Sequence, residues 1–358
     1  MSTQILAVGL ALVAVAWTVL PFLRHDAWWI RVFDFPRVQG AVLTAAVAAA
    51  YAALAGWDGA LDKAILAVLG LCVAYQGFWV LRFTPLYPKQ VLPAPASGPD
   101  NHLAILTANV LTPNRNADAF LKLVRATDPD VIVAVETDAW WQSRLDALEA
   151  DYPHAVKHPL DNLYGMHLYS RLPLEDPQVR FLVEDGVPSI HTGVVLRSGH
   201  RVALHALHPA PPSPTENPTS AERDAELLMV AKAVAGDGRS RVVVGDLNDV
   251  AWSATTRLFQ KISGLLDPRV GRGLFNTFHA QYPVFRWPLD HVFCSPDFTV
   301  ASLARLGDIG SDHFPIHAVL CHTPAARDRH DVPRADAADE ALAEEKIVKV
   351  NGDAPETA

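Results

Sequence analysis

The sequence predicts three membrane-spanning helices followed by a soluble α/β or α+β domain, in which packed β-sheets carry helices on their outer sides. Two observations predict this architecture. Three long apolar runs stand in the first part of the chain, and beyond them short β-rich runs alternate with stretches of helical periodicity. Because 50% of the 358 residues are hydrophobic, the chain can bury a sizeable core, which excludes a fully disordered protein.

The three apolar runs cover residues 4–23, 38–57 and 64–80. Each has close to the ~20 residues that a helix needs to cross the hydrocarbon core of a bilayer. Two weaker alternatives are buried core helices, which are rarely uncharged over such lengths, and a cleaved signal peptide, although no Lys or Arg precedes the first run. We therefore interpret residues 1–89 as the membrane anchor of a multi-pass plasma (inner) membrane protein, with membrane lipids as partners.

The side of the membrane that carries the large domain stays open at this stage. Five Lys or Arg residues (Arg24, Arg31, Arg37, Arg82 and Lys89) flank the spans on the side of the domain, and Lys63 stands alone on the other side. By the positive-inside rule, this count favours a cytoplasmic domain. A domain of this size can, however, translocate whatever its charge.

Beyond the anchor, we expect three further parts. Residues 90–101 are rich in Pro, Ala, Ser and Gly, which predicts a stiff, extended linker. Residues 102–322 form the compact domain, and residues 323–358 are predicted to be a solvated acidic tail, with a fraying helix as the alternative. Within the compact domain we expect strands over residues 102–108, 131–135, 167–169, 193–197, 201–206, 241–244, 291–294 and 315–320, and helices over 118–126, 140–150, 220–235 and 253–261. The Ser198-Gly199 pair between two of the strands is a hairpin signal.

Polar side chains capable of chemistry stand at the ends of these predicted strands. Each alone has a plainer explanation in a turn or a cap, but together they form a constellation of carboxylates, amides and imidazoles. Such oxygen-rich sets suit a hard cation such as Mg²⁺, whereas zinc would require more His and Cys at close spacing. The residues are Asn109, Glu136, His208, Asp246, Asn248, Asp290, Asp312 and His313.

The motifs around these residues resemble the endonuclease/exonuclease/phosphatase (DNase I-like) superfamily. They are TANV (107–110), VAVET (133–137), LHP (207–209), GDLND (245–249), PLDHV (288–292) and GSDHFPI (310–316), and they span the whole compact domain. With three spans ahead of it, the chain looks like the bacterial membrane-anchored branch, some of whose relatives are linked to glycopeptide resistance, which favours an exterior domain. The resemblance implies a four-layered sandwich and phosphoester hydrolysis assisted by Mg²⁺, with Mn²⁺ as an alternative ion.

The resemblance also implies a role for each residue. Glu136 would be the principal metal ligand, with Asn109 and Asp312 close by. Asp246 would orient or deprotonate the attacking water, Asn248 and His208 would contact the phosphate, and Asp290 would fix the tautomer of His313. Whether Asp246 or His313 is the base stays open. His208 is preferred to His205 because the turn HPAPP resembles the His-Pro turn of the family. Asp290 is preferred to its neighbour His291, which would point to the opposite face of the strand.

Three functions follow as hypotheses. The first is a membrane-anchored, metal-dependent phosphoesterase with a phosphorylated, lipid-linked substrate, since tethering concentrates the site beside lipid headgroups. The second is a nuclease, which the net charge of -9 disfavours because binding to nucleic acid relies on Lys and Arg. The third is a catalytically silent membrane scaffold, which has no need for facing buried carboxylates. The oligomeric state is not predicted.

Overall fold

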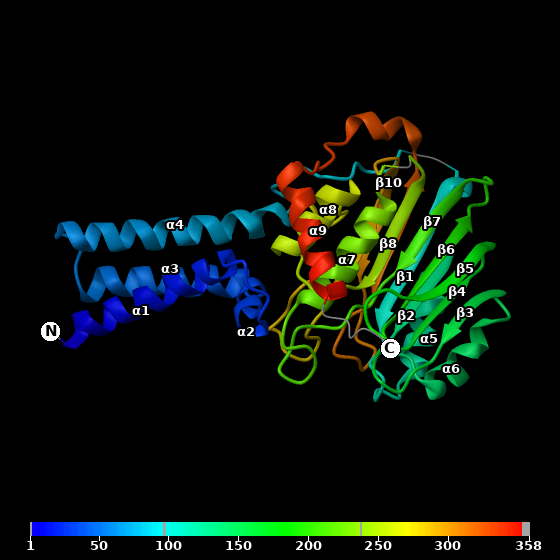
Figure 1. The fold of residues 1–358 in the computed structure, drawn as a ribbon, viewed down its shortest axis with the longest axis horizontal. Helices are drawn as coiled ribbons and strands as arrows, with labels where there is room; N and C mark the ends of the chain where they lie inside the picture. The colour runs from blue at the N-terminus through cyan, green and yellow to red at the C-terminus, as the bar shows by residue number, and fades with distance from the viewer. Residues whose placement is uncertain (1, 96–97, 237, 353–358) are drawn as a thin grey trace.

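Three long helices project from one side of a β-sandwich (Figure 1). The computed structural model describes residues 2–95, 98–236 and 238–352. The long helices are α1 (Ser2–Val19), α3 (Arg37–Leu54) and α4 (Ala60–Arg82). All three are long and apolar enough to cross a membrane, judged by length and composition. The N-terminal end of α1 lies far from the sandwich, so the N-terminus and the sandwich stand at opposite ends of the helical bundle (Figure 1).

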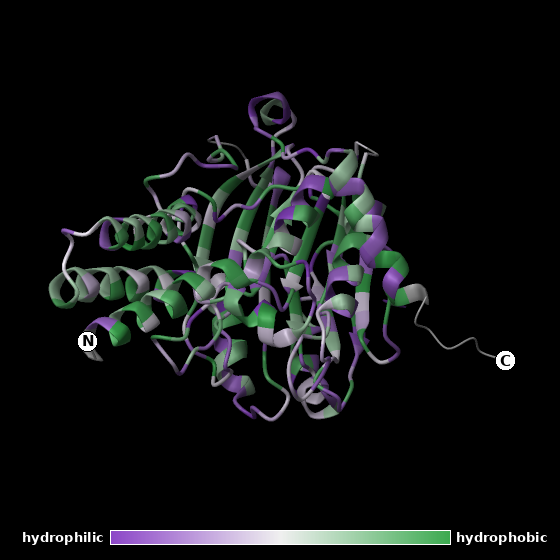
Figure 2. Cartoon of the chain, turned by 60° about the vertical axis from the view of Figure 1, so that its left-hand side comes forward, coloured by the Kyte–Doolittle hydropathy of each residue, from purple (hydrophilic) through white to green (hydrophobic). Residues whose placement is uncertain are grey.

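The bundle is held together by small residues and by one polar cluster. Ala7, Ala11 and Ala14 of α1 are buried against the other two helices, which lets the backbones approach closely. Gln76 of α4 is fully buried and donates to the Thr18 hydroxyl at 2.6 Å. The outward sides of the three helices are apolar (Figure 2). Small residues thus let the three helices pack closely, and the Gln76 amide nitrogen finds a hydroxyl acceptor between them.

The chain between α1 and α3 docks onto the sandwich. It contains the short helices η1 (Leu20–Phe22), α2 (Trp28–Arg31) and η2 (Val32–Asp34). The Trp28 N–H donates to the Pro218 carbonyl at 3.0 Å, and the Trp252 indole N–H donates to the Asp34 carbonyl at 2.7 Å. The anchor is thus bonded to the domain on the side of the loop that precedes helix α7 (Ala221–Val234).

The sandwich has two sheets. The six-stranded sheet has the order β10-β11-β1-β2-β4-β3, and the five-stranded sheet has the order β5-β6-β7-β8-β9. In the first sheet β1 pairs parallel with β2, and in the second β7 pairs parallel with β8. The strands are β1 (His102–Asn109), β2 (Val131–Val135), β3 (His154–His158), β4 (Met166–Ser170), β5 (Leu174–Phe181), β6 (Pro188–Val195), β7 (Arg201–Ala206), β8 (Ser240–Asp246), β9 (Asp290–Cys294), β10 (Phe298–Arg305) and β11 (Ile316–His322).

Side-chain alternation along the strands builds four layers, as expected. In β2, Val131, Val133 and Val135 point into the core between the sheets, and Ile132 and Ala134 point outward. Helices α5 (Ala117–Thr127) and α6 (Ala139–Leu145), followed by η4 (Asp146–Leu148), cover the outer face of the first sheet. Helices α7 and α8 (Ala254–Ser263) cover that of the second. The predicted sandwich with helices on its outer sides is therefore confirmed.

The region predicted as a solvated tail differs from that expectation. After η5 (Pro324–Arg329), residues Ala337–Gly352 form helix α9, which packs on α7 and α8. Ala343 is fully buried there, and Lys346 donates to Asp26 at 2.9 Å and to Asp224 at 2.8 Å. A few apolar contacts and these ion pairs hold a helix whose other side faces water. Residues 353–358 lie outside the described residues.

The segment predicted to be an extended linker is packed against the domain. Val91 is fully buried, the Ala94 N–H donates to the Val300 carbonyl at 2.8 Å, and the Val300 N–H donates to the Leu92 carbonyl at 2.9 Å. These bonds pair the segment with the outer side of β10, an edge strand whose backbone groups there have no neighbouring strand. Residues 96–97 lie outside the described residues, and η3 (Pro99–Asn101) leads into β1. The segment between α4 and β1 is therefore bonded to the edge of the six-stranded sheet.

Candidate active site

The eight predicted site residues come from strand ends and loops at one edge of the sandwich. Asn109 ends β1 and Glu136 follows β2, in the first sheet. In the second sheet, Asp246 ends β8. Asp290 begins β9, the neighbouring strand, which runs antiparallel to β8 and therefore starts beside the end of β8. His208 and Asn248 follow β7 and β8, and Asp312 and His313 precede β11. Both sheets thus contribute to a single cluster.

A histidine flanked by two carboxylates lies at the centre of the cluster. The distance from His313 Nδ1 to Asp290 Oδ2 is 2.7 Å, and that from His313 Nε2 to Asp246 Oδ2 is 3.4 Å. All three side chains are buried. The Nδ1 group is hydrogen-bonded to Asp290, whereas Nε2 lies within ion-pair distance of Asp246 without a hydrogen bond to it and can serve another acceptor. The predicted pairing of Asp290 with His313 is present. His291 points away from the site, as expected, and its ring contacts the Asp249 carbonyl at 2.8 Å.

Asn109 joins the two sheets. Its amide nitrogen donates to Glu136 Oε1 at 2.6 Å and to Asp246 Oδ2 at 3.1 Å. Its amide oxygen accepts from the Leu111 N–H at 3.0 Å. In this orientation Asn109 positions the two carboxylates, and its oxygen would reach a metal ion only after the amide turned over.

The backbone has a positive φ angle at three positions of the cluster. Glu136 has φ of 61° and Asn248 has φ of 50°, in the left-handed region that non-glycine residues rarely adopt. Gly245 precedes Asp246 at φ of 137°, and a Cβ placed there would lie 2.0 Å from the Leu207 carbonyl oxygen. Only glycine allows β8 to pass this close to the end of β7. That close passage brings Asp246 beside His208, where the distance from His208 Nε2 to Asp246 Oδ2 is 3.8 Å.

Burial and neighbouring charges shift the pKa values of the clustered side chains. Burial alone would lower the pKa of His313, but Asp246 and Asp290 outweigh it and raise that pKa to about 10. Burial opposes ionisation of Asp246, yet His313 and His208 hold the pKa of Asp246 below its ordinary value. Burial raises the pKa of Glu136 to about 7 and lowers that of His208 to about 4. The cluster therefore combines a cationic imidazole, an ionised acceptor and a buried carboxylate that lacks a counter-charge of its own.

The two histidines at the end of β7 are separated. His208 faces the cluster, and its ring centroid lies 5.3 Å from that of Tyr164. His205 lies within β7 and points to the other side, where its Nδ1 is 2.7 Å from His191 Nδ1. The structure thus places His208, and not His205, beside the other predicted site residues.

Three supporting residues escaped the sequence analysis. The Ser311 hydroxyl donates to the Asn109 carbonyl at 2.8 Å and accepts from the His313 N–H at 3.0 Å. The Thr277 hydroxyl accepts from the Asp290 N–H at 3.2 Å. Arg223 of α7 donates to the Asn248 carbonyl at 2.8 Å. Ser311 lies within the GSDHFPI motif and could have been proposed from it, whereas no local pattern marks Thr277 or Arg223.

The cluster opens into a cavity of about 610 Å³. Glu136, His208, Asp246, Asn248, Asp312 and His313 line its polar side. Its other side is apolar and includes residues of the anchor, namely Trp17, Trp28, Val32, Phe35 and Pro36, together with Leu163, Phe278, Phe285 and Trp287 of the domain. The Phe35 and Trp287 rings meet edge to face with centroids 5.8 Å apart. The anchor thus forms part of the wall around the polar cluster.

The residues present fit a divalent cation beside Glu136. Glu136 Oε2 is buried and has no hydrogen-bond partner among the described residues, so it offers a free oxygen ligand. Asp312 and Asp246 add negative charge nearby. Asp246, Asp290 and His313 also lie close enough together to hold an ion, but His313 already bridges these two carboxylates. We therefore place the cation on the Glu136 side of the cluster.

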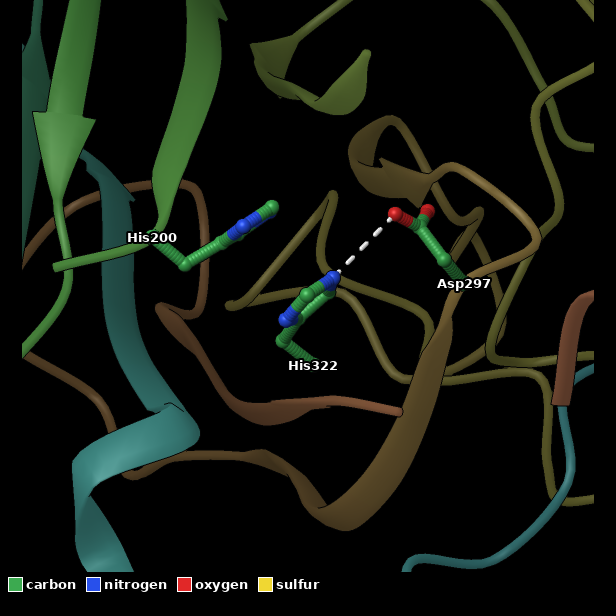
Figure 3. Close-up of side chains that lie close together, drawn as sticks. All are labelled: His200, Asp297 and His322. Carbon is green, nitrogen blue, oxygen red and sulfur yellow. Dashed lines mark ion pairs between the residues drawn. The ribbon is translucent and has the colours of Figure 1, made fainter. Parts of the chain in front are cut away.

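A second cluster of metal-binding residue types lies elsewhere in the domain and consists of His200, Asp297 and His322 (Figure 3). Both oxygens of Asp297 already have partners, because Ser295 donates to Oδ1 and Ser240 to Oδ2. Arg327 also lies 3.3 Å from Oδ2. Because a guanidinium repels a cation, this cluster is better explained as a hydrogen-bonded network that joins β8 to the segment before β10.

Comparison with known proteins gives the same fold. The structure of D. rerio TDP2 complexed with single strand DNA product is 18% identical, with a TM-score of 0.52, and the match covers 62% of this chain and 99% of that one. An endonuclease/exonuclease/phosphatase from Beutenbergia cavernae is 21% identical, with a TM-score of 0.50 and coverage of 62% and 72%. The human Nocturnin catalytic domain with bound sulfate anion is 15% identical, with a TM-score of 0.50 and coverage of 63% and 96%. At these identities the likeness shows the fold alone. No curated protein matches the sequence.

The model of the endonuclease/exonuclease/phosphatase family matches residues 106–313, which is more than half of the chain and contains all eight site residues. Endonucleases, exonucleases and phosphatases all hydrolyse phosphoester bonds, and the buried oxygen ligand on Glu136 agrees with the divalent metal that the family generally uses. The chain therefore belongs to the endonuclease/exonuclease/phosphatase family of metal-dependent phosphoester hydrolases.

Proposed function

We propose that this protein is a membrane-anchored, Mg²⁺-dependent phosphoesterase whose substrate is a phosphorylated lipid or a lipid-linked pyrophosphate. One observation carries the proposal: a single cavity is lined by the polar cluster on one side and by residues of the membrane anchor on the other. Trp17 belongs to α1, and Trp28 and Phe35 belong to the segment that follows it. A substrate whose phosphate reaches the cluster would thus place its remaining atoms against the anchor.

The apolar wall favours a lipid over a water-soluble ester. Trp17 lies in the last turn of α1, Trp28 begins α2 and Phe35 follows η2, so these rings stand just beyond the end of the first span, where aromatic side chains border the hydrocarbon core. Burying one aromatic or aliphatic side chain against such a wall contributes about 1.5–3 kcal/mol. A prenyl or acyl chain gains this contribution, whereas a nucleotide offers little to it. The net charge of -9 also disfavours a long polyanion as substrate.

The protein residues provide the remaining steps of hydrolysis. A divalent ion held by Glu136, with Asp312 nearby, would supply Lewis-acid stabilisation of the phosphate oxygens. Asp246 is positioned to orient a water molecule and accept its proton, because its carboxylate is held by the Asn109 amide and by the Asn248 N–H at 2.9 Å. His313, flanked by carboxylates, would donate to a phosphate oxygen as charge builds there. Asn248 uses one amide hydrogen on the Pro209 carbonyl and keeps the other for the substrate.

The experiment measures hydrolysis by the full-length protein in detergent micelles, with Mg²⁺ and with EDTA, read as phosphate release from a pyrophosphate, alcohol release from a phosphodiester and nicking of plasmid DNA. The substrates are a polyprenyl pyrophosphate, a water-soluble phosphodiester and plasmid DNA. We expect the lipid to be hydrolysed with the highest kcat/KM, and we expect Asp246→Asn to lower kcat by about 10²–10⁴-fold. Asp118→Asn, which changes an exposed carboxylate of α5, is the matched control.

Each outcome discriminates between the hypotheses. Efficient nicking of DNA that is lost in Asp246→Asn would replace the proposal with a nuclease. Hydrolysis of the soluble ester alone would remove the lipid from the proposal. If none of the substrates were turned over by folded protein, a scaffold role would be favoured instead.

A further inference from the structure

A second cavity, of about 440 Å³, lies where the anchor helices meet the domain. It is bounded by the segment after α1, the first turn of α3, Tyr75 of α4, the start of α8 and the end of α9. We call it the basic interfacial cavity, after the six cationic side chains that line it: Arg24, Arg31, Arg37, Arg257, Lys346 and Lys349. It shares no lining residue with the catalytic cavity.

The cations of this cavity exceed the anions that could neutralise them. Arg31 and Arg37 are buried and share one carboxylate, that of Asp34, at 3.2 Å and 3.3 Å. The Nε atoms of both arginines are buried without a hydrogen-bond partner among the described residues. Burial raises the pKa of Asp34 to about 6, although both arginines lower it. One carboxylate cannot neutralise two buried guanidinium groups, and an anion bound from outside would supply the missing negative charge.

A third guanidinium adds to this excess. Arg257 donates to the Trp252 carbonyl at 2.8 Å and lies 4.2 Å from the centre of the Trp79 ring. Its hydrogen bond goes to a carbonyl, and the carboxylate that acts on its charge is that of Asp34, which Arg31 and Arg37 already share. Lys346 and Lys349, in contrast, are both paired with Asp26. The uncompensated positive charge therefore lies on the arginines.

The first turn of α8 adds donors of another kind. Ala254 and Thr255, the first two residues of this helix, line the cavity. The first N–H groups of a helix have no partner within it, and the Ser253 side chain caps only that of Thr256, at 2.9 Å. These N–H groups and the helix dipole favour an anion, and they lie beside three arginines. Guanidinium groups and helical N–H groups together form the donor set that binds phosphate oxygens best.

The surroundings of the cavity favour the phosphate group of a lipid as its ligand. Phe22 and Leu23 line it and are 56% and 48% exposed, beside the apolar outer side of the bundle (Figure 2). The Phe22 and Tyr75 rings lie 5.0 Å apart and form the border between the cavity and the bundle. A lipid with its headgroup phosphate in the cavity could lay its acyl chains along α1 and α4. Because the cavity lies at the ends of the candidate spans, it would be level with the lipid headgroups in a membrane.

We propose that the basic interfacial cavity binds the headgroup phosphate of an anionic membrane lipid, as a site separate from the catalytic cavity. The segment of α2 and η2 divides the two cavities. Trp28, Val32 and Phe35 face the catalytic cavity, whereas Arg31 and Asp34 face the basic one. A lipid bound on the basic side would therefore brace the wall of the catalytic cavity. This inference rests on the insertion of the three helices in a membrane and not on hydrolysis of a lipid.

The test measures binding rather than activity, so its failure is distinguishable from failure of the proposed function. Full-length protein in neutral detergent is titrated with fluorescent phosphatidylglycerol, fluorescent phosphatidylcholine or inorganic phosphate. We expect saturable binding of phosphatidylglycerol and about tenfold weaker binding in Arg257→Gln, because one charge-assisted hydrogen bond contributes on that order. Because Arg257 packs on Trp79, a second variant, Arg24→Gln with Lys349→Gln, tests the mouth of the cavity without touching that contact.

Lys89→Gln is the matched control, because it removes an exposed charge on the same side of the anchor outside the cavity. Retention of binding in this control, together with its loss in both cavity variants, would support the proposal. Equal affinity for phosphatidylcholine, or equal weakening in Lys89→Gln, would overturn it, since the attraction would then be unspecific. Displacement of the lipid by inorganic phosphate at similar concentrations would overturn the assignment to a lipid.

Discussion

Replacing Glu226 by Gln should stabilise the folded protein in alkaline solution and leave its stability nearly unchanged in acid. Glu226 lies in α7 and is 2% exposed, and its Oε1 has no hydrogen-bond partner among the residues that the structure describes. Burial, with a smaller contribution from the Glu184 carboxylate, raises the pKa of Glu226 from 4.5 to about 8. The folded protein therefore prefers the neutral acid, whereas the unfolded chain ionises at the ordinary pKa.

The sign and the size follow from proton linkage. Between pH 4.5 and about 8 the folded state binds more protons at Glu226 than the unfolded state, so the free energy of unfolding falls as the pH rises through this window. At about 1.4 kcal/mol for each pKa unit, the full loss is about 5 kcal/mol, and about 3 kcal/mol of it is present at pH 7. Glutamine keeps the shape of the neutral acid and cannot ionise, so the variant does not incur this loss.

The assay is thermal unfolding of the full-length protein in neutral detergent at about pH 5 and about pH 9. At roughly 2–4 °C for each kcal/mol, we expect the Glu226→Gln midpoint to exceed that of the wild type by about 10 °C at the higher pH and by little at the lower. Glu222→Gln, on the more accessible side of the same helix, controls for the loss of a carboxylate. An equal difference between Glu226→Gln and wild type at both pH values would refute the reasoning.

Three further predictions concern the site, its wall and the last helix. Asp290→Asn should lower kcat about a hundredfold or more with little change in KM, because His313 loses the carboxylate 2.7 Å from its Nδ1; steady-state kinetics on folded protein checks this. Phe35→Ala should lower kcat/KM for a polyprenyl pyrophosphate about 10–100-fold and leave kcat/KM for a water-soluble phosphodiester unchanged. Equal losses of kcat/KM for both substrates would contradict a contact between Phe35 and the lipid chain. Deleting the chain from Ala337 onward should lower the unfolding midpoint by roughly 5–10 °C, because α7 and α8 lose the apolar cover of α9; an unchanged midpoint would show that α9 is not packed in solution.

The positions of several candidate site residues were predictable because they lie at or directly after strand ends. Asp246 ends a run of buried valines, and Asn109 and Glu136 end two neighbouring parallel strands. Parallel strands deliver their carboxyl ends to one edge of a sheet, so local patterns along the chain implied proximity in space. The pairing of Asp290 with His313 required more, because the two residues lie 23 positions apart. That pair came from the resemblance of the motifs and not from periodicity.

The strands that the sequence analysis missed lie at sheet edges. β3 and β10 are the edges of the six-stranded sheet, and β5 is an edge of the five-stranded one. In β5 (LEDPQVRF) five of the eight residues are exposed, a Pro interrupts the run, and the pairing with β6 shifts between Glu175 and Gln178. An edge strand has one free side and little burial, so its sequence lacks the apolar run or clean alternation that predicts a strand. Central strands such as β2 carry that signal in every residue.

Long-range packing explains the other differences. Helix α9 is held by Ala343 and by Lys346, which bonds to Asp26 and Asp224 at positions distant in sequence. Its own composition, with many alanines and charges, is also that of a solvated tail. A helix stabilised mainly by distant ion pairs and small apolar contacts therefore has no local signature. The docking of α2 through the Pro218 carbonyl was unpredictable for the same reason.

The way the anchor is joined to the domain bears directly on which substrates can reach the site. A flexible linker would let the domain turn freely, so soluble and membrane-bound esters would approach alike. Here the Gly271 N–H donates to the Arg82 carbonyl at 2.9 Å, and the Phe83 ring packs on Trp252 with centroids 5.8 Å apart, directly after α4. The catalytic cavity is therefore held in one orientation relative to the bundle. Because Phe35 is part of its wall, a domain cut from the helical bundle would lose one side of the pocket, so the proposed preference for a lipid has to be tested on the full-length protein.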